Sequence, residues 1–345
     1  MPVAQTHLHG RTAPELAADM GIDRSSGAAA TLDPSRIADI ATQIGLRPEF
    51  FSFDPATWDD PHYWNSEASR QQRSQYFAIG NSINFRFWFL RENAVMPCVG
   101  TIGGEQLRGA MYMWRCLRRG WERGDFPLLD ASFLARFTQE HFDCIFSDDN
   151  GVNPLKVGSA DRIANLKDLG HQLLASYDGQ FLNVVESSEG SLSRFAEESK
   201  TFRAFDDPLL KLTMVNAILH SGSGVYRFLD DPLPAMDYHL VRHALRQGMI
   251  RPSPTLAEKL RSANLLQAEE ALELRRVALS AFLSLSECTG VKGDVLDNKF
   301  WLNRSNCTSA DPVCTDPSLA SRCPFYGGCA QYVDYGLPLE ITRYY

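Results

Sequence analysis

The chain has 345 residues, of which 44% are hydrophobic, and a formal net charge of −8 at pH 7. This length and apolar content predict a soluble globular protein and exclude a disordered one. The negative charge argues against sequence-independent binding of duplex nucleic acid, because such binding requires a basic face. A nucleotide or nucleoside is therefore the more readily expected ligand.

The sequence shows neither a secretion signal nor a membrane span. Residues 1 to 27 lack the apolar run of a signal peptide, and no stretch reaches the roughly 18 uncharged apolar residues of a spanning helix. We therefore expect a cytoplasmic protein without membrane contact. In such a chain the eight cysteines are expected to be thiols or metal ligands and not a disulfide framework.

A loose N-terminal arm is predicted for residues 1 to 31, which are rich in small and polar residues and have no sustained apolar period. A helix is expected over residues 34 to 45, with Pro34 in its first turn and isoleucines at helical spacing. Residues 76 to 89 mix β-branched and aromatic side chains. Together with residues 99 to 102 they predict one small antiparallel β element.

From residue 105 onward apolar residues recur at helical spacing, and Pro and Gly signals separate the segments. The expected helices cover residues 105–121, 132–146, 159–177, 191–200, 208–220, 238–247, 255–262 and 267–288. We therefore predict a mainly α fold. A single helical domain would cover residues 32 to 302, and a cysteine-rich tail, residues 303 to 345, would pack on it.

One acidic residue, Asp237, stands at the start of a predicted helix. Aspartate is a favoured N-cap, and the unpaired N–H groups and positive dipole end of a helix favour its ionised form. A fixed carboxylate of this kind can stabilise an oxocarbenium ion, or orient the attacking water, when an N-glycosidic bond is cleaved. A helix cap with no catalytic role is the simpler alternative.

Four cysteines lie close together in the tail with the spacing C-x6-C-x8-C-x5-C, namely Cys307, Cys314, Cys323 and Cys329. Four thiols in a segment with little regular structure can be organised by a metal centre. Structural zinc sites commonly contain a short C-x2-4-C pair, and this tail has none. The spacing therefore favours a [4Fe-4S] cluster over a structural zinc ion or two disulfides.

Two resemblances meet on these residues. Residues 236 to 242 resemble the segment that carries the catalytic aspartate in helix-hairpin-helix DNA glycosylases of the endonuclease III type. The cysteine loop resembles the iron–sulfur loop of those enzymes, with x8 where they have a central x2. A more extensive similarity, to the queuosine-salvage protein family, covers about residues 48 to 302 and 338 to 345 and is carried by residues 80–88, 179–187 and 235–238.

The second resemblance implies hydrolysis of queuosine 5′-phosphate to free queuine on a DNA-glycosylase-like helical fold. Both resemblances imply that Asp237 stabilises the transition state. The residues implied in substrate binding are Met236 and Tyr238 beside Asp237, His62 and Trp301 around the base, and Asn81 and Asn84. For the two asparagines, capping of a turn is the alternative.

The chain departs from the queuosine-salvage family at Asn81 and Leu302, where the family has aspartates. Leucine at 302 removes an anionic partner for the amine or hydroxyls of queuine, so the base is expected to be queuosine-like, a 7-deazaguanine or a related modified purine. No Leu-Pro-Gly-Val-Gly hairpin precedes Asp237, and no lysine stands in the place of this hairpin to act as a Schiff-base nucleophile. Both features argue against duplex binding and lyase chemistry.

We therefore expect an N-glycosidase that releases the free base from a modified nucleotide for salvage. One alternative is a DNA base-excision glycosylase with a [4Fe-4S] cluster. The other is a non-catalytic nucleotide-binding or redox-sensing iron–sulfur protein.

Overall fold

The computed structural model describes residues 10–24, 27–54, 60–92 and 94–345. The chain forms two compact units: the first comprises residues 1–53, 188–195 and 227–338, and the second comprises residues 54–187, 196–226 and 339–345. The sequence predicted one helical domain over residues 32 to 302. Each unit is built from segments that are distant in the sequence, and the predicted domain bounds stay a prediction.

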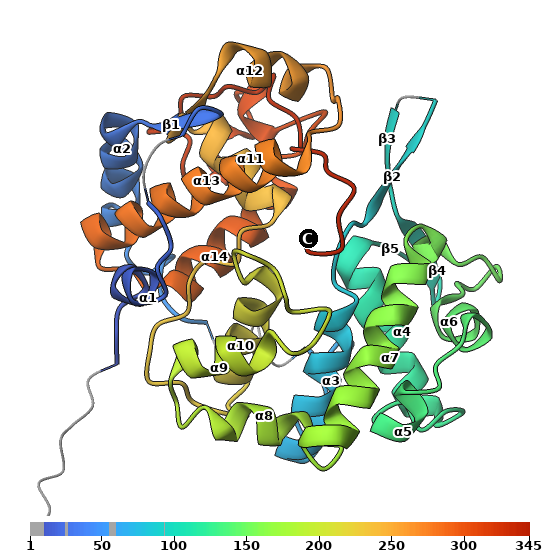
Figure 1. Cartoon of the computed structure of the whole chain (residues 1–345). Coiled ribbons are helices and arrows are strands. Elements are labelled where there is room, and N and C mark those ends of the chain that lie inside the picture. The colour runs from blue at the N-terminus through green and yellow to red at the C-terminus, as the bar shows by residue number, and fades with distance from the viewer. Residues whose placement is uncertain (1–9, 25–26, 55–59, 93) are drawn as a thin grey trace, which may run out of the picture. The chain divides into compact units, whose positions relative to one another are not determined.

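The first unit is built around a long helix, α13, which packs against α1, α2, α11 and α14 (Figure 1). Leu274, Ala278 and Phe282 recur at helical spacing on α13 and are fully buried, which stabilises the unit by about 1.5–3 kcal/mol for each large side chain. The elements of this unit are α1 (Ala13–Asp19), β1 (Ala30–Leu32), α2 (Pro34–Gly45), α11 (Tyr238–Arg246), β6 (Ile250–Pro252), α12 (Pro254–Arg261), α13 (Ala268–Thr289), α14 (Gly293–Leu302) and the 3-10 turns η3 (Asn303–Ser305), η4 (Val313–Thr315) and η5 (Ala320–Arg322).

The N-terminal segment differs from the loose arm that the sequence predicted. Helix α1 has a reciprocal capping box between Thr12 and Glu15 and buries Leu16, while β1 pairs with β6 in an antiparallel sheet. Helix α1 has only about two turns, which is too short for an apolar period to be recognised in the sequence. Its capping box and its buried face nevertheless stabilise it. Residues 1–9 and 25–26 of the expected arm lie outside the described residues.

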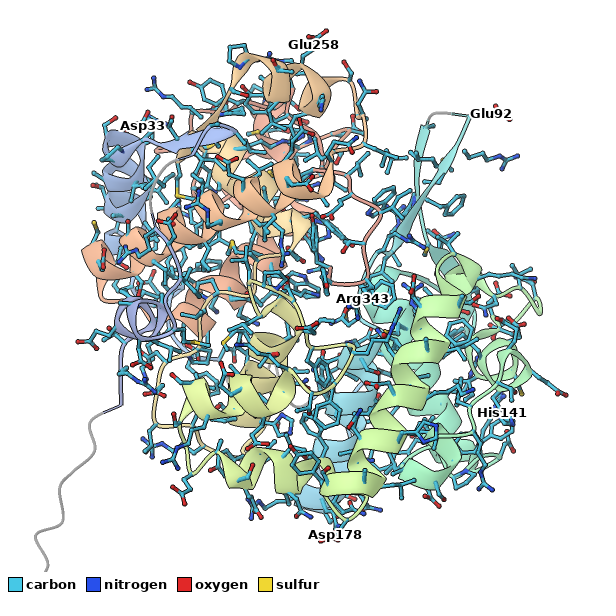
Figure 2. All side chains as sticks on the ribbon, in the orientation of Figure 1. Asp33, Glu92, His141, Asp178, Glu258 and Arg343 are labelled. Carbon is cyan, nitrogen blue, oxygen red and sulfur yellow. The ribbon has the colours of Figure 1, made fainter. Side chains whose placement is uncertain are left out.

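Helix α2 confirms the sequence prediction at both ends. Its N-cap, Asp33, labelled in Figure 2, accepts hydrogen bonds from the backbone N–H groups of Ser35 at 3.2 Å and Arg36 at 3.3 Å. The second carboxylate oxygen of Asp33 accepts a hydrogen bond from Arg251 Nε at 2.8 Å. The cap therefore also joins α2 to β6.

The second unit is helical, with two small hairpins. Its elements are α3 (Arg70–Ser82), β2 (Trp88–Arg91), β3 (Ala94–Pro97), β4 (Val99–Ile102), β5 (Glu105–Arg108), α4 (Gly109–Arg123), α5 (Ala131–Leu134), α6 (Gln139–Phe146), the 3-10 turn η2 (Pro154–Lys156), α7 (Ser159–Ser176), α8 (Phe181–Ser187) and α10 (Lys211–Gly222), and α9 (Leu192–Ser199) contributes its second half. Within the described part of the chain, no helix has both the length and the apolar character that a membrane crossing requires.

The predicted mainly α fold is confirmed, and residues 99 to 102 form a strand, β4, as predicted, but residues 76 to 82 of the expected β segment do not. Residues 70 to 82 form α3 and not a strand. Residues 74 to 82 are buried without exception, so no polar face reveals the helical period, and their aromatic and β-branched side chains favour a strand by propensity alone. Strand β4 pairs with β5, where the sequence predicted the start of a helix.

A buried histidine of the second unit makes stability depend on pH. His220 has no exposed surface, its Nδ1 bonds Asn216 O at 2.7 Å, and its Nε2 bonds Ser74 Oγ at 2.9 Å. Burial lowers the pKa of His220 to about 4. Because the unfolded chain takes up this proton near pH 6.5 and the folded chain only near pH 4, the unfolded state binds more protons between these values.

Stability should therefore be complete above pH 6.5 and fall by about 3 kcal/mol as the pH drops to 4. Urea unfolding at pH 7 and pH 4.5 would measure this loss. His220→Gln should flatten the dependence, whereas His171→Gln, a change at an exposed histidine of α7, should leave it unchanged. An equal dependence in wild type and His220→Gln would contradict this assignment.

Candidate active site

Asp237 is the N-cap of α11, as the sequence predicted. Its Oδ1 accepts hydrogen bonds from the backbone N–H groups of His239 at 2.8 Å and Leu240 at 2.9 Å. The side chain sits in a buried setting, since only 7% of the residue is exposed. Two N–H donors and the positive end of a helix therefore hold this carboxylate in one orientation.

The residues on either side of Asp237 are also buried. Met236 is 0% exposed and Tyr238 is 8% exposed. The Tyr238 ring lies 4.6 Å from that of His239, centroid to centroid. An apolar side chain and an aromatic ring thus flank the carboxylate in the chain, and the binding role of these two residues stays a prediction.

The guanidinium group of Arg304 lies over the ring of Trp301, near the end of α14. The guanidinium carbon of Arg304 lies 3.2 Å from the centre of the Trp301 ring, and Arg304 Nη1 donates to Trp301 O at 3.0 Å. Burial lowers the pKa of Arg304 to about 10, while the charge of Asp237 acts in the opposite direction. Arg304 therefore lies within electrostatic reach of Asp237.

The first unit thus brings together Asp237, Tyr238 and Trp301, which the sequence predicted, and Arg304, which it did not. Arg304 follows Trp301 by three residues in a 3-10 turn that no periodicity indicated. A carboxylate, a neighbouring cation and an aromatic face are suited to a polar, charged ligand with a planar group, since the ring can stack and the charges can orient.

The other three predicted substrate-binding residues lie in the second unit. The His62 side chain is 63% exposed, and its Nδ1 lies 3.0 Å from Asp60 Oδ1. Asn81 is fully buried in α3, where its Nδ2 donates to Asn216 Oδ1 at 2.7 Å and its Oδ1 accepts from Asn84 Nδ2 at 3.3 Å. The two asparagines therefore form one side-chain network and do not cap a turn.

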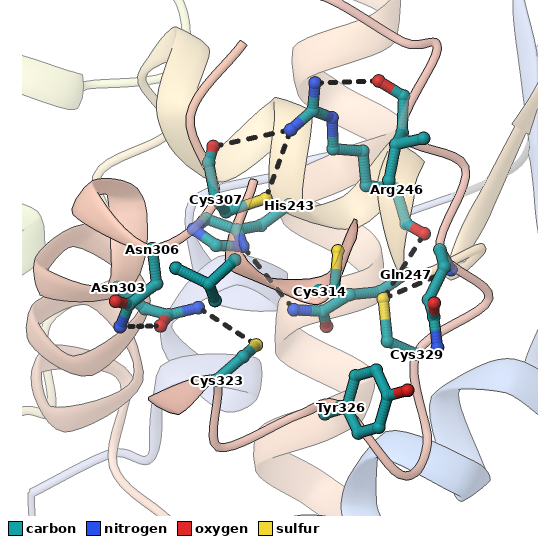
Figure 3. A pocket seen from close by; sticks show the side chains of 13 residues that line it. His243, Arg246, Gln247, Asn303, Asn306, Cys307, Cys314, Cys323, Tyr326 and Cys329 are labelled. Atoms are coloured by element: carbon teal, nitrogen blue, oxygen red, sulfur yellow. Dashed lines mark hydrogen bonds between the residues drawn. The ribbon is translucent and has the colours of Figure 1, made fainter. Parts of the chain in front are cut away.

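The four tail cysteines line one small cavity in the first unit (Figure 3). Its wall consists of His243, Arg246, Gln247, Asn303, Asn306, Cys307, Val313, Cys314, Cys323, Tyr326, Cys329, Gln331 and Val333. The cavity has a volume of about 20 Å³, which is room for about one water molecule. The cavity is therefore too small to be the nucleotide pocket.

Three of the four sulfurs accept hydrogen bonds from N–H groups. Arg246 Nη1 donates to Cys307 Sγ at 3.5 Å, Asn303 Nδ2 to Cys323 Sγ at 3.7 Å, and Gln331 N to Cys329 Sγ at 3.3 Å. N–H donors of this kind surround metal-bound thiolates. Within the described ranges, however, no three side chains of His, Cys, Asp or Glu come close enough to hold a metal ion.

Burial raises the pKa of three of these thiols. The shift is upward for Cys314 and Cys323 and takes Cys329 to about 12. Nearby sulfurs act in the same direction, because thiolates that face one cavity repel one another. A cation between the sulfurs would offset both effects. The four thiols therefore have the chemistry of a metal site, although the described side chains do not have its spacing.

Comparison with known proteins finds relatives over part of the chain. A family profile described as queuosine salvage protein matches residues 62–211, which include His62, Asn81 and Asn84 and end before Asp237. A mouse protein named queuosine 5′-phosphate N-glycosylase/hydrolase is 23% identical over 237 residues, or 64% of this chain and 69% of the mouse protein. A Sphaerobacter thermophilus protein of the same name is 22% identical over 284 residues, covering 77% of this chain and 83% of that protein. The cattle protein of this name is 22% identical over 225 residues, with coverages of 61% and 64%.

Proposed function

We propose that this chain, which belongs to the queuosine-salvage family, is an N-glycosidase that hydrolyses the bond between base and ribose in a queuosine-like nucleotide. The observation that carries the proposal is the carboxylate of Asp237, held by two backbone N–H groups at the start of α11. The names of the relatives favour this function over a DNA-repair glycosylase or a non-catalytic iron–sulfur protein.

In the proposed mechanism Asp237 acts by charge. As the bond to the base breaks, the ribose acquires oxocarbenium character, and a fixed carboxylate stabilises that positive charge more in the transition state than in the substrate. The same carboxylate can orient the water that attacks the sugar. Met236 and Tyr238 would contact the base next to Asp237, and Trp301 would stack on the base. For His62, Asn81 and Asn84 a role in substrate binding rests on the family resemblance alone.

The test is direct. The purified protein is incubated with queuosine 5′-phosphate, queuosine and other modified nucleotides, and free base is separated and identified by mass. Release of queuine or a related base supports the proposal, and a 5′-phosphate requirement would identify the nucleotide as substrate. Absence of any free base from all of them would overturn it.

The residue after Trp301 provides a test of base specificity. Leu302 is 41% exposed and stands where the family resemblance implies an aspartate. Because a hydrogen bond to a charged group contributes about 1.5–3 kcal/mol, Leu302→Asp should raise kcat/KM for queuosine 5′-phosphate by about tenfold. It should have no such effect on 7-deazaguanosine 5′-phosphate, which lacks the amine. Leu302→Asn is the uncharged control, and an equal change for both substrates would contradict the assignment.

For the tail we propose a [4Fe-4S] cluster held by Cys307, Cys314, Cys323 and Cys329, with a structural zinc ion as the alternative. Support comes from the four sulfurs that line one cavity and from the N–H donors at three of them. Elemental analysis of anaerobically purified protein decides between the two: iron with sulfide supports the cluster, and zinc supports the alternative. If the protein contains neither iron nor zinc, the proposed metal site is wrong.

We propose the cytoplasm as the place of action. All eight cysteines are free thiols in the structure, and a reducing compartment keeps thiols in that state. A fractionated cell extract would test the location, and recovery of the protein from an oxidising compartment would contradict it.

A further inference from the structure

The chain just before α11 is irregular and buried. Residues 231 to 237 have no regular secondary structure, and residues 232 to 237 are buried. A buried segment of this kind cannot satisfy its backbone N–H and C=O groups within a helix or sheet, so their partners must come from other elements. Pro232 and Pro234 lack an N–H group, which leaves fewer donors to satisfy.

Two charged side chains from neighbouring helices supply such partners. Arg275, on α13, donates from Nε to Met236 O at 3.1 Å. Asp297, on α14, accepts from Ala235 N–H at 2.7 Å through Oδ2. Arg275 is only 2% exposed, and Ala235 and Met236 are buried, so water cannot replace either bond without a change in packing. These bonds hold the two residues that immediately precede Asp237.

Two groups of contacts in the structure bear on the direction of the Asp237 carboxylate. The N–H groups of His239 and Leu240, which belong to α11, hold one carboxylate oxygen. The backbone that leads into Asp237 sets where its Cα lies. A buried irregular segment has no hydrogen-bond ladder to fix that position, so side chains from α13 and α14 must do so.

We infer that Arg275 and Asp297 are positioning residues that fix the backbone of Ala235 and Met236 and thereby aim the carboxylate of Asp237 at the reacting sugar. The inference rests on the proposed function. Electrostatic catalysis is sensitive to position, since a misplacement of about 1 Å costs up to about 10²-fold in rate. In this inference both residues act on Asp237 through the two backbone groups that they bind.

The test uses two substitutions, Arg275→Lys and Asp297→Leu, assayed with queuosine 5′-phosphate; leucine is close to aspartate in size but cannot accept the bond from Ala235 N–H. We expect kcat to fall about tenfold or more for each, with KM within about twofold, because a displaced carboxylate weakens transition-state stabilisation and leaves substrate binding intact. The control is Arg276→Lys on the same helix, whose Nη1 instead binds Asp23 Oδ2 at 2.9 Å on the surface. This control should retain the wild-type kcat.

Hydrogen exchange provides a readout that needs no activity. In wild type the amides of His239 and Leu240 should be protected by Asp237, and both substitutions should speed their exchange while the rest of α11 stays protected. Unchanged kcat, or exchange of these two amides as slow as in wild type, would overturn the inference. If Arg275→Lys does not fold, Asp297→Leu decides the question alone. If wild type releases no base, the proposed function fails, and the exchange data still decide whether the two residues position Asp237.

Discussion

Asp237→Asn should lower kcat for base release by about 10³-fold while the fold stays intact. Asparagine has nearly the same shape as aspartate and is an equally good N-cap, so the hydrogen bonds from His239 and Leu240 can be retained. What disappears is the negative charge opposite the developing oxocarbenium ion, and loss of one preorganised electrostatic contact typically costs about 10²–10³ in kcat. Steady-state kinetics with queuosine 5′-phosphate and urea unfolding would measure the two effects.

The matched control for this experiment is Asp130→Asn. Asp130 is the N-cap of α5, and its carboxylate accepts from the backbone N–H of Ser132 at 2.7 Å. It shares the capping chemistry of Asp237 but belongs to the second unit, outside the proposed machinery. The control should leave kcat unchanged. Equal activity of Asp237→Asn and wild type would reduce Asp237 to a cap and remove the basis of the proposed mechanism.

The start of α11 could be predicted because its signals are local. An aspartate before a run of apolar residues at helical spacing identifies the cap, and the structure has that cap at Asp237. The four cysteines could likewise be grouped, because they lie within one short stretch of sequence and line one cavity. In both cases the residues that act together are close in the chain.

The supports of the site could not be predicted because they come from distant residues. Arg275 and Asp297 reach the chain before Asp237 from helices 39 and 62 positions further along, and nothing in the local pattern of α13 or α14 separates them from solvent-facing charges. Arg304 is recognisable only once its position on the Trp301 ring is known. Helix α3 was missed for a different reason, since burial on every side removes the amphipathic pattern.

Arg246, the last residue of α11, joins that helix to both flanks of the cysteine loop. Its guanidinium donates to Thr308 O at 2.6 Å on one flank, and to Tyr335 O at 2.7 Å and Val333 O at 2.9 Å on the other. The residue is only 2% exposed. One buried cation therefore satisfies several carbonyl groups of a segment that has little regular structure of its own.

Arg246→Met should lower the free energy of unfolding by about 3–5 kcal/mol, because methionine fills the space of the stem but leaves those buried carbonyls without donors. Urea unfolding at neutral pH would measure the loss. Arg261→Met is the control, since Arg261 pairs with Asp334 where both side chains are 51% exposed, and such surface pairs contribute about 0–1 kcal/mol. If Arg246→Met lowers the free energy of unfolding no more than Arg261→Met does, the cysteine loop is stabilised by its own packing and not by Arg246. A large loss would mean that the cysteine loop depends on the same helix that carries Asp237 at its other end.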